Sequence, residues 1–227
     1  MSASASPSRI DRRAMRIEVC IDAQPAAEAA LADGADRLEV CARLDLDGLS
    51  PDPELLRQLR AATERPLFAM VRPRPGDFVL QDGEPDAMRR DLEQALELGA
   101  DGVVIGCLTA QGEIPDQELG WVLDALPQGF PRTFHRAFES ALDPAASLAR
   151  IAGLGFDRVL GSGRPGKVVD HLPYLTELVA LAQQRGLVWL PGGGVRPHNA
   201  DQILAHLPVQ ELHSSAGQGW AAWRRRA

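Results

Sequence analysis

The chain has 227 residues, with 24 lysines and arginines against 31 aspartates and glutamates, for a formal net charge of −7. A hydrophobic fraction of 45% excludes a disordered chain, and three cysteines are too few for a disulfide-rich secreted scaffold. The acidic balance argues against nucleic acid or an anionic membrane surface as partner, because both are bound by clustered positive charge. Lys167 is the only lysine, so Schiff-base chemistry has a single candidate residue.

The N-terminal residues differ in character from the rest of the chain. Residues 1–15 are rich in serine and arginine, lack the apolar stretch of a secretory signal, and predict a disordered tail. No stretch approaches the roughly 20 apolar residues of a membrane span. No linker or change of composition divides residues 16–227, which we expect to form one domain. Cysteines in a chain without a secretion signal predict free thiols and a cytoplasmic location.

From residue 16 onward, short runs rich in β-branched residues alternate with longer amphipathic runs. The short runs predict eight strands: Arg16–Ile21, Arg37–Cys41, Leu67–Arg72, Gly102–Leu108, Arg132–Ala137, Asp157–Ser162, Leu187–Pro191 and Val209–Ser214. Glycines at 34, 99, 155 and 186 mark the ends of four predicted helices between them. Eight strands that each precede a helix predict an α/β fold, a single (β/α)₈ TIM-type barrel. Only residues 217–227 follow the last strand, so we expect a truncated eighth helix.

The first two predicted strands end on a duplicated tripeptide. One ends Glu18-Val-Cys20 and the other Glu39-Val-Cys41. Alternation along a strand puts each glutamate on the same face as its cysteine, and neighbouring strands lie about 4.8 Å apart. Ligands of such barrels bind at the carboxyl ends of the strands. We therefore expect two carboxylates and two thiols to share a small patch, where soft thiolates would favour Cu(I). The alternative is that the cysteines are ordinary small residues of the core.

Two loops at the same end of the barrel predict an anion site. The glycine run 191–195 follows the seventh strand, and His213-Ser-Ser-Ala-Gly217 lies at the end of the eighth. Backbone N–H groups of Gly193 and Gly194 and the hydroxyls of Ser214 and Ser215 can hold a phosphate there. The alternative is that these segments are tight turns that only close the barrel.

Arg72 and His135 end the third and fifth predicted strands. Histidine can act as an acid or base near neutral pH, and a guanidinium group can bind a carboxylate or phosphate with two hydrogen bonds. The alternative is a structural network in which Arg72 and Glu39 neutralise each other. The histidines at 171, 198 and 206 lie on helices or helix starts without zinc-binding spacing, so we expect no zinc or iron site.

Several ordered blocks between Arg16 and Gly217 together resemble the CutC family, named for copper homeostasis. The blocks are Glu18–Cys20, Gly34–Cys41, Gly48–Pro51, Arg72–Arg74, Gly76–Phe78, Thr133–Phe138, Arg158–Leu160 with Ser162-Gly163, Gly192–Val195 and His213–Gly217. The resemblance implies a TIM-type barrel, a cytosolic location, a role in copper homeostasis, Cu(I) binding by Cys20 and Cys41, and a homodimer. The chain departs from the family pattern at Asp47 and Pro75, where the family has glycine, and in its short C-terminal segment.

Two hypotheses follow. The first is a copper-homeostasis protein that holds Cu(I) through Cys20 and Cys41 at the barrel mouth. The second is a barrel enzyme of unknown reaction that acts on a small phosphorylated or anionic substrate. In the second, Glu39 and His135 would be acid and base groups and Arg72 would position the substrate. The residues assigned to ligand binding are Glu18, Gly193, Gly194, Ser214 and Ser215.

Overall fold

The structure is a computed structural model that describes residues 11–215 and 217–226. Residues 1–10 of the expected N-terminal tail lie outside the described residues. Residues 11–15, the rest of that expected tail, are held against the barrel. The guanidinium group of Arg12 pairs with Asp201 at 2.8 Å, and Met15 is buried. The predicted tail is therefore too long at this end, because these residues have partners in the domain.

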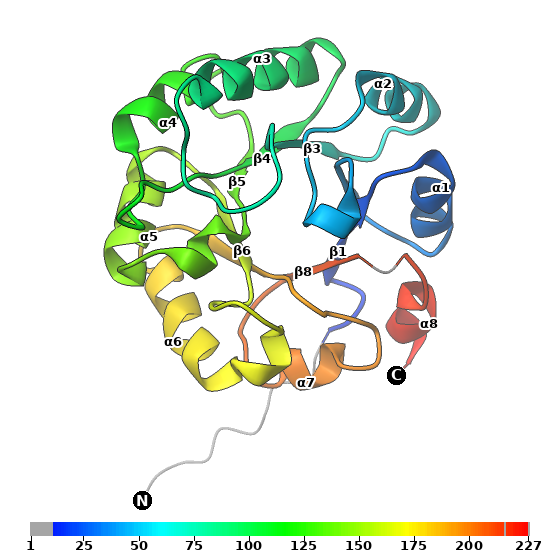
Figure 1. The fold of residues 1–227 in the computed structure, drawn as a ribbon. Helices are drawn as coiled ribbons and strands as arrows, with labels where there is room; N and C mark the ends of the chain where they lie inside the picture. Colours follow the sequence, from blue (N-terminus) through cyan, green and yellow to red (C-terminus); the bar gives the residue numbers. More distant parts are fainter. Residues whose placement is uncertain (1–10, 216, 227) are drawn as a thin grey trace, which may run out of the picture.

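A sheet of parallel strands forms the centre of the molecule (Figure 1). Within the described residues it has eight strands in the order β7-β6-β5-β4-β3-β2-β1-β8, and β7 and β8 contact each other. The sheet is thus a nearly closed barrel with helices outside, and the predicted TIM-type fold is confirmed. The strands are β1 (Arg16–Ile21), β2 (Arg37–Val40), β3 (Leu67–Val71), β4 (Gly102–Ile105), β5 (Arg132–Phe134), β6 (Arg158–Gly161), β7 (Val188–Pro191) and β8 (Glu211–Ser214).

Most predicted strands extend too far at their carboxyl ends. β2 ends one residue before Cys41, β3 one residue before Arg72, and β5 one residue before His135. His135 instead precedes a 3₁₀ helix over Arg136–Ser140 and accepts a hydrogen bond from its backbone. Cys41, Arg72 and His135 therefore come directly after their strands, at the carboxyl end of the barrel.

The helices surround the barrel in the alternation that the sequence predicts. Prolines occupy the first turn of several helices, and the side chains of Asp52 and Asp143 accept hydrogen bonds from the first backbone N–H groups of α2 and α5. The four predicted helix-ending glycines all have φ between 75° and 90°. The helices are α1 (Gln24–Ala32), α2 (Pro53–Ala62), α3 (Glu84–Glu97), α4 (Asp116–Leu123), α5 (Pro144–Gly153), α6 (Leu172–Gln183), α7 (Ala200–Leu204) and α8 (Trp220–Arg225).

The apolar residues form two clusters. The larger one lies between the strands and the surrounding helices. The smaller one contains Cys20, Cys41, Phe68, Met70, Val104, Leu160 and Leu190, and comes from the other face of the same strands. The two thiols are thus part of the packing inside the barrel, and polar groups occupy the remaining inner positions of β1, β2 and β8.

The eighth helix is short, as expected, and the chain covers the adjacent barrel surface by itself. Trp220 and Trp223 are both buried and pack edge to face with ring centroids 5.6 Å apart. The indole N–H of Trp223 donates to Asp201 at 3.0 Å. Both tryptophans therefore pack within the chain and are not exposed for contact with a partner. None of the helices in the described residues is both long and apolar enough to cross a bilayer.

Candidate functional site

A cavity of about 340 Å³ opens at the carboxyl end of the strands, which is the barrel mouth. Of the residues predicted from sequence, its lining includes Cys20, Glu39, Arg72, His135, Gly193, Gly194, Ser214 and Ser215. Cys41 and Glu18 are outside the lining and are completely buried. The structure therefore brings nearly all predicted site residues to one cavity.

The two thiols meet beneath this cavity. The Sγ atoms of Cys20 and Cys41 are 3.4 Å apart, and the Cys41 thiol donates to the backbone oxygen of Ile21 at 3.4 Å. Met70 lies in the same buried cluster as the two cysteines. The hydrogen bond to Cys41 and burial raise the pKa of Cys20 well above the usual thiol range. Without a bound cation, Cys20 is therefore a protonated thiol.

Carboxylates and a histidine lie next to the thiols because of strand register. Cys20 pairs with Glu39 across β1 and β2, and Glu18 pairs with His213 across β1 and β8. Nδ1 of His213 is 2.7 Å from Oε1 of Glu18 and 3.9 Å from Oε2 of Glu39. Glu18 also accepts from the buried guanidinium group of Arg37. A column of polar groups thus runs down the barrel interior from Cys20 to Arg37.

The two glutamates in this column have opposite electrostatic surroundings. Burial alone would raise the pKa of Glu18, but the charge of Arg37 and the hydrogen bond from His213 lower it to about 2. Burial raises the pKa of Glu39, whose Oε2 has no hydrogen-bond partner among the described residues. For His213, the charges of Glu39 and Glu18 outweigh burial, so its pKa is raised. Glu18 is therefore a fixed anion, whereas Glu39 can exchange a proton or accept a cation.

Cys20, Glu39 and His213 form a group that could hold a metal ion, since one ligand atom from each lies within 4.8 Å of the others. His213 is the residue that sequence reasoning missed. The search for histidine pairs at zinc-binding spacing could not find it, because its neighbours are about 170 to 200 residues away in the chain. The position of His213 on the last strand could have revealed it, because the last strand of a closed barrel pairs with the first strand.

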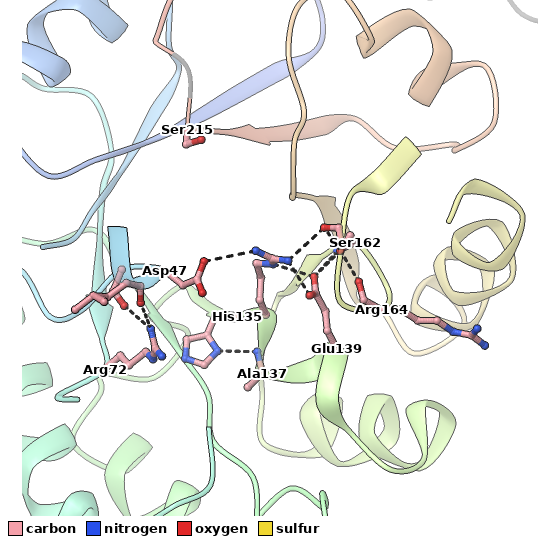
Figure 2. Close-up of polar contacts among 12 residues, drawn as sticks. Asp47, Arg72, His135, Ala137, Glu139, Ser162, Arg164 and Ser215 are labelled. Atoms are coloured by element: carbon pink, nitrogen blue, oxygen red, sulfur yellow. Dashed lines mark hydrogen bonds and ion pairs between the residues drawn. The ribbon is translucent and has the colours of Figure 1, made fainter. Parts of the chain in front are cut away.

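Arg72 does not neutralise Glu39. Its guanidinium group donates to the backbone oxygens of Leu46 and Gly48, both at 2.9 Å, and of Gly76 at 2.8 Å (Figure 2). It therefore ties together the loops that follow β2 and β3. The alternative interpretation, in which Arg72 and Glu39 neutralise each other, does not hold, because the arginine turns toward the loops on the rim. Its Nε atom is buried without a partner in the described part of the chain.

His135 lies beside Arg72 on the wall of the cavity (Figure 2). Its Nδ1 accepts a hydrogen bond from the backbone N–H of Ala137 at 3.2 Å, and its buried Nε2 has no partner among the described residues. Burial and the positive charge of Arg72 lower the pKa of His135 to about 3. The imidazole is therefore neutral at physiological pH and can donate a hydrogen bond to a ligand through Nε2.

The 3₁₀ helix that follows His135 places an acidic residue in the lining that the sequence did not reveal. The side chain of Glu139 is 5% exposed, pairs with Arg136 at 2.9 Å, and accepts from the hydroxyl of Ser162 at 2.8 Å (Figure 2). Arg136 also approaches Asp47 at 4.0 Å. Asp47 has a φ of 63°, a conformation that favours the glycine of the family pattern. This network links the loops after β2, β5 and β6 across the mouth.

The predicted anion loops are next to each other. Gly193 and Gly194 have φ of 113° and 72°, and Nη2 of Arg196 is 3.2 Å from the hydroxyl of Ser215. The hydroxyl of Ser214 donates to the backbone oxygen of Val195 at 2.8 Å, and this hydrogen bond joins the two loops. The loops thus close the barrel and also line its cavity. Lys167 is exposed and outside this lining, so it stays a poor candidate for a Schiff base.

Fold and site together define a TIM-type barrel with a sulfur-containing polar pocket at its mouth. The CutC family profile matches residues 15–218, and the chain belongs to the CutC family. It is 40% identical to the copper homeostasis protein cutC homolog of Homo sapiens over 200 residues, which is 88% of this chain and 72% of the human protein. It is 38% identical to the CutC protein of Pasteurella multocida, with 91% of this chain and 83% of that protein covered.

Solved structures agree with this assignment. The CutC protein of Streptococcus agalactiae superposes with a TM-score of 0.83 at 28% identity, covering 90% of this chain and all of that one. A 2-keto-3-deoxy-6-phosphogluconate aldolase of Zymomonas mobilis has a TM-score of 0.56 at 20% identity, over 94% of this chain and 88% of the aldolase. The second likeness shows only the shared barrel fold.

Proposed function

We propose that the protein binds Cu(I) through Cys20 and Cys41 and acts in copper homeostasis, as the names of its relatives state for them. The observation that carries this proposal is the 3.4 Å separation of the two sulfur atoms at the base of the mouth cavity. Paired thiolates are soft ligands that select Cu(I) over the harder divalent ions.

The strand register favours a bridging metal over a disulfide. Cys20 is paired with Glu39, so Cys41 lies two residues further along the chain, just past the end of β2. Such a diagonal separates Cα atoms by roughly 7–8 Å, more than the roughly 4.4–6.8 Å of most disulfides. Both cysteines are free, and their sulfur atoms are 3.4 Å apart. This arrangement fits two sulfur ligands on one ion.

The surroundings supply further support for a bound cation. Oε2 of Glu39 is buried without a hydrogen-bond partner in the described residues, which costs free energy unless a cation or proton satisfies it. Met70 belongs to the same buried cluster as both thiols, and the imidazole of His213 has a ligand atom within 4.8 Å of those of Cys20 and Glu39. Glu18 then has a positioning role, because it holds the ring of His213.

The location and assembly of the protein are further parts of the proposal. Buried free thiols keep their function in a reducing compartment, so we place the protein in the cytoplasm. A homodimer is expected from the family, and light scattering during size-exclusion chromatography tests it. Twice the mass of one chain supports the dimer, and the mass of one chain contradicts it.

An anaerobic Cu(I) titration against a strong chelator tests the thiol site. The wild-type protein should bind about one ion. The Cys20→Ser/Cys41→Ser double variant should lose at least a hundredfold in affinity, because hydroxyl oxygens are poor ligands for Cu(I). Cys107→Ser is the matched control, since Cys107 is also a buried thiol but lies outside the mouth cavity. Equal affinity in the double variant and in the wild type would exclude the thiol site.

A second candidate function is an enzyme that acts on a small anionic substrate. It is favoured by the buried polar atoms without partners in the described residues at Glu39, Arg72 and His135, three lining residues of one cavity. In this proposal Glu39 is the acid or base, Arg72 positions the substrate, and the loops of Gly193, Gly194, Ser214 and Ser215 hold its anionic group. The neutral His135 would donate from Nε2.

A thermal-shift screen with phosphorylated metabolites tests this second candidate. A ligand present at one hundred times its Kd stabilises the folded state by about 2.7 kcal/mol. The stabilisation should be reduced in a His135→Ala variant and unchanged in Cys107→Ser. If no phosphorylated compound raises the melting temperature, the enzyme proposal is wrong, and the copper proposal is unaffected.

A further inference from the structure

A second cavity, of about 610 Å³, opens at the opposite end of the barrel, where the strands begin. Its lining comes from the residues just before β1 and from the first residues of several strands or the loops before them. The charged members of the lining are Arg13, Arg16, Asp36, Arg37, Arg65, Asp101 and Arg158. In a chain with a net charge of −7, this face is therefore rich in arginine.

Three arginines in the floor of this cavity converge on one carboxylate. Glu211 is 2.8 Å from Arg16, 2.7 Å from Arg37 and 3.5 Å from Arg158. Arg37 has a second partner in Glu18, whereas the Nη2 group of Arg158 has none among the described residues. Two carboxylates, Glu18 and Glu211, cannot neutralise three guanidinium groups, so the cluster keeps an excess of positive charge.

The acidic residues of the lining do not remove this excess, because each is already paired with an arginine outside it. Asp36 pairs with Arg224, and Asp101 pairs with Arg60 at 2.7 Å. The exposed side chains of Arg13 and Arg65 make neither a hydrogen bond nor an ion pair within the described residues. The cavity thus has two guanidinium groups without partners in the described residues at its rim, and in its floor the Nη2 group of Arg158 is available to a ligand.

The floor is held in a fixed arrangement by an aromatic ring. The guanidinium carbons of Arg37 and Arg158 lie 4.7 Å and 5.0 Å from the ring centroid of Phe68. A Cβ atom on Gly102 would lie 2.5 Å from this ring, so the ring needs a glycine beside it. Cation–π contacts and close packing orient both arginines before any ligand arrives.

We propose that this cavity binds a small, multiply charged oxyanion, namely phosphate or a phosphate ester. Guanidinium groups bind phosphate oxygens with paired, charge-assisted hydrogen bonds, and here they surround a concave site from several strands. A single carboxylate ligand would leave much of the excess charge in place. The site lies at the end of the barrel away from the proposed copper and enzyme sites, so it is a separate binding site and does not depend on either proposal.

Inorganic phosphate and pyrophosphate are the probes for this site, with sodium chloride at matched ionic strength as the reference. At one hundred times its Kd, a bound anion should raise the Tm of the wild-type protein by about 5 °C. Calorimetric titration gives Kd and the number of sites. The absence of both a Tm shift and heat of binding at millimolar pyrophosphate would overturn the proposal.

Variants assign the binding to this cavity. Arg13→Gln/Arg65→Gln removes the two rim groups and should weaken pyrophosphate binding about tenfold or more. Arg90→Gln/Arg225→Gln is the matched control, because these arginines are also exposed and without side-chain partners in the described residues, and the change in net charge is equal. Equal weakening of pyrophosphate binding in both double variants would show a general effect of net charge and would contradict the proposal. Loss of pyrophosphate binding in Arg196→Gln, with binding kept in both double variants, would place the anion at the mouth and would also contradict it.

Discussion

The mouth and the base of the barrel carry opposite chemistry, although β1 and β2 contribute to both. At the mouth, Cys20 and Glu39 are sulfur and carboxyl groups that suit a cation. At the base, Arg37 and Arg158 suit an anion. The two ends are joined through Glu18, which contacts His213 on one side and Arg37 on the other. Side chains two positions apart on a strand point into the barrel together, so β1 and β2 can present groups that suit a cation at the mouth and groups that suit an anion at the base.

Removing the group that joins the two ends should have the largest effect on stability. Arg37→Met leaves Glu18 and Glu211 buried beside fewer positive charges, and breaking a buried ion pair in this way costs about 3–5 kcal/mol. Urea unfolding at neutral pH measures the loss. Arg57→Met, which removes an exposed pair with Glu54, should leave the urea midpoint close to that of the wild type, because water screens this pair. If the Arg37 variant is as stable as the Arg57 variant, the contacts of Arg37 with Glu18 and Glu211 do not stabilise the folded protein.

The mouth should also control how stability depends on pH. The pKa of His135 is about 3 in the folded protein, against about 6.5 in an unfolded chain. The unfolded chain therefore takes up the proton first, and stability falls as the pH drops from about 6.5 toward 3. Between pH 7 and pH 4 this one group accounts for a loss of about 3 kcal/mol.

A comparison of variants isolates the contribution of His135. Urea unfolding of His135→Gln across this pH range should show a decline shallower by about that amount. His198→Gln, at an exposed histidine without a side-chain partner in the described residues, should follow the wild-type curve. Parallel curves for the His135 variant and the wild type would mean that the ring is protonated in the folded state at the same pH as in water.

A smaller change at the base should sharpen the difference between the two ends. Gly102→Ala places a methyl group against the ring of Phe68, and such overpacking costs about 1–3 kcal/mol. Because Phe68 orients Arg37 and Arg158, the variant should also weaken pyrophosphate binding while Cu(I) affinity stays unchanged. Chemical unfolding and the two titrations measure these effects. Equal losses of affinity for pyrophosphate and for Cu(I) would show that the two ends of the barrel are not independent.

The sequence predicts the fold well because its information is local. Strand and helix runs alternate with helix-ending glycines, and these signals lie within a few residues of the elements they define. The predicted meeting of Cys20 and Cys41 also agrees with the structure, since it follows from two adjacent strands and the alternation of side chains.

The parts of the site that could not be predicted depend on barrel closure and on side-chain direction. His213 contacts Glu18 only because β8 pairs with β1, and no local spacing reveals that register. The contacts of Arg72 could not be predicted either, because the chain leaves β3 before this residue and its guanidinium group binds loop carbonyls. The arginine cavity combines strand starts from most of the barrel, and each of these residues looks ordinary in the sequence.

The most direct test of the central claim is copper X-ray absorption spectroscopy of the Cu(I)-loaded protein. The account predicts that the first coordination shell contains two sulfur neighbours, contributed by Cys20 and Cys41. The sulfur signal should be lost in the Cys20→Ser/Cys41→Ser variant and kept in Cys107→Ser. A wild-type shell of nitrogen and oxygen neighbours alone, or an unchanged sulfur signal in the double variant, would contradict it.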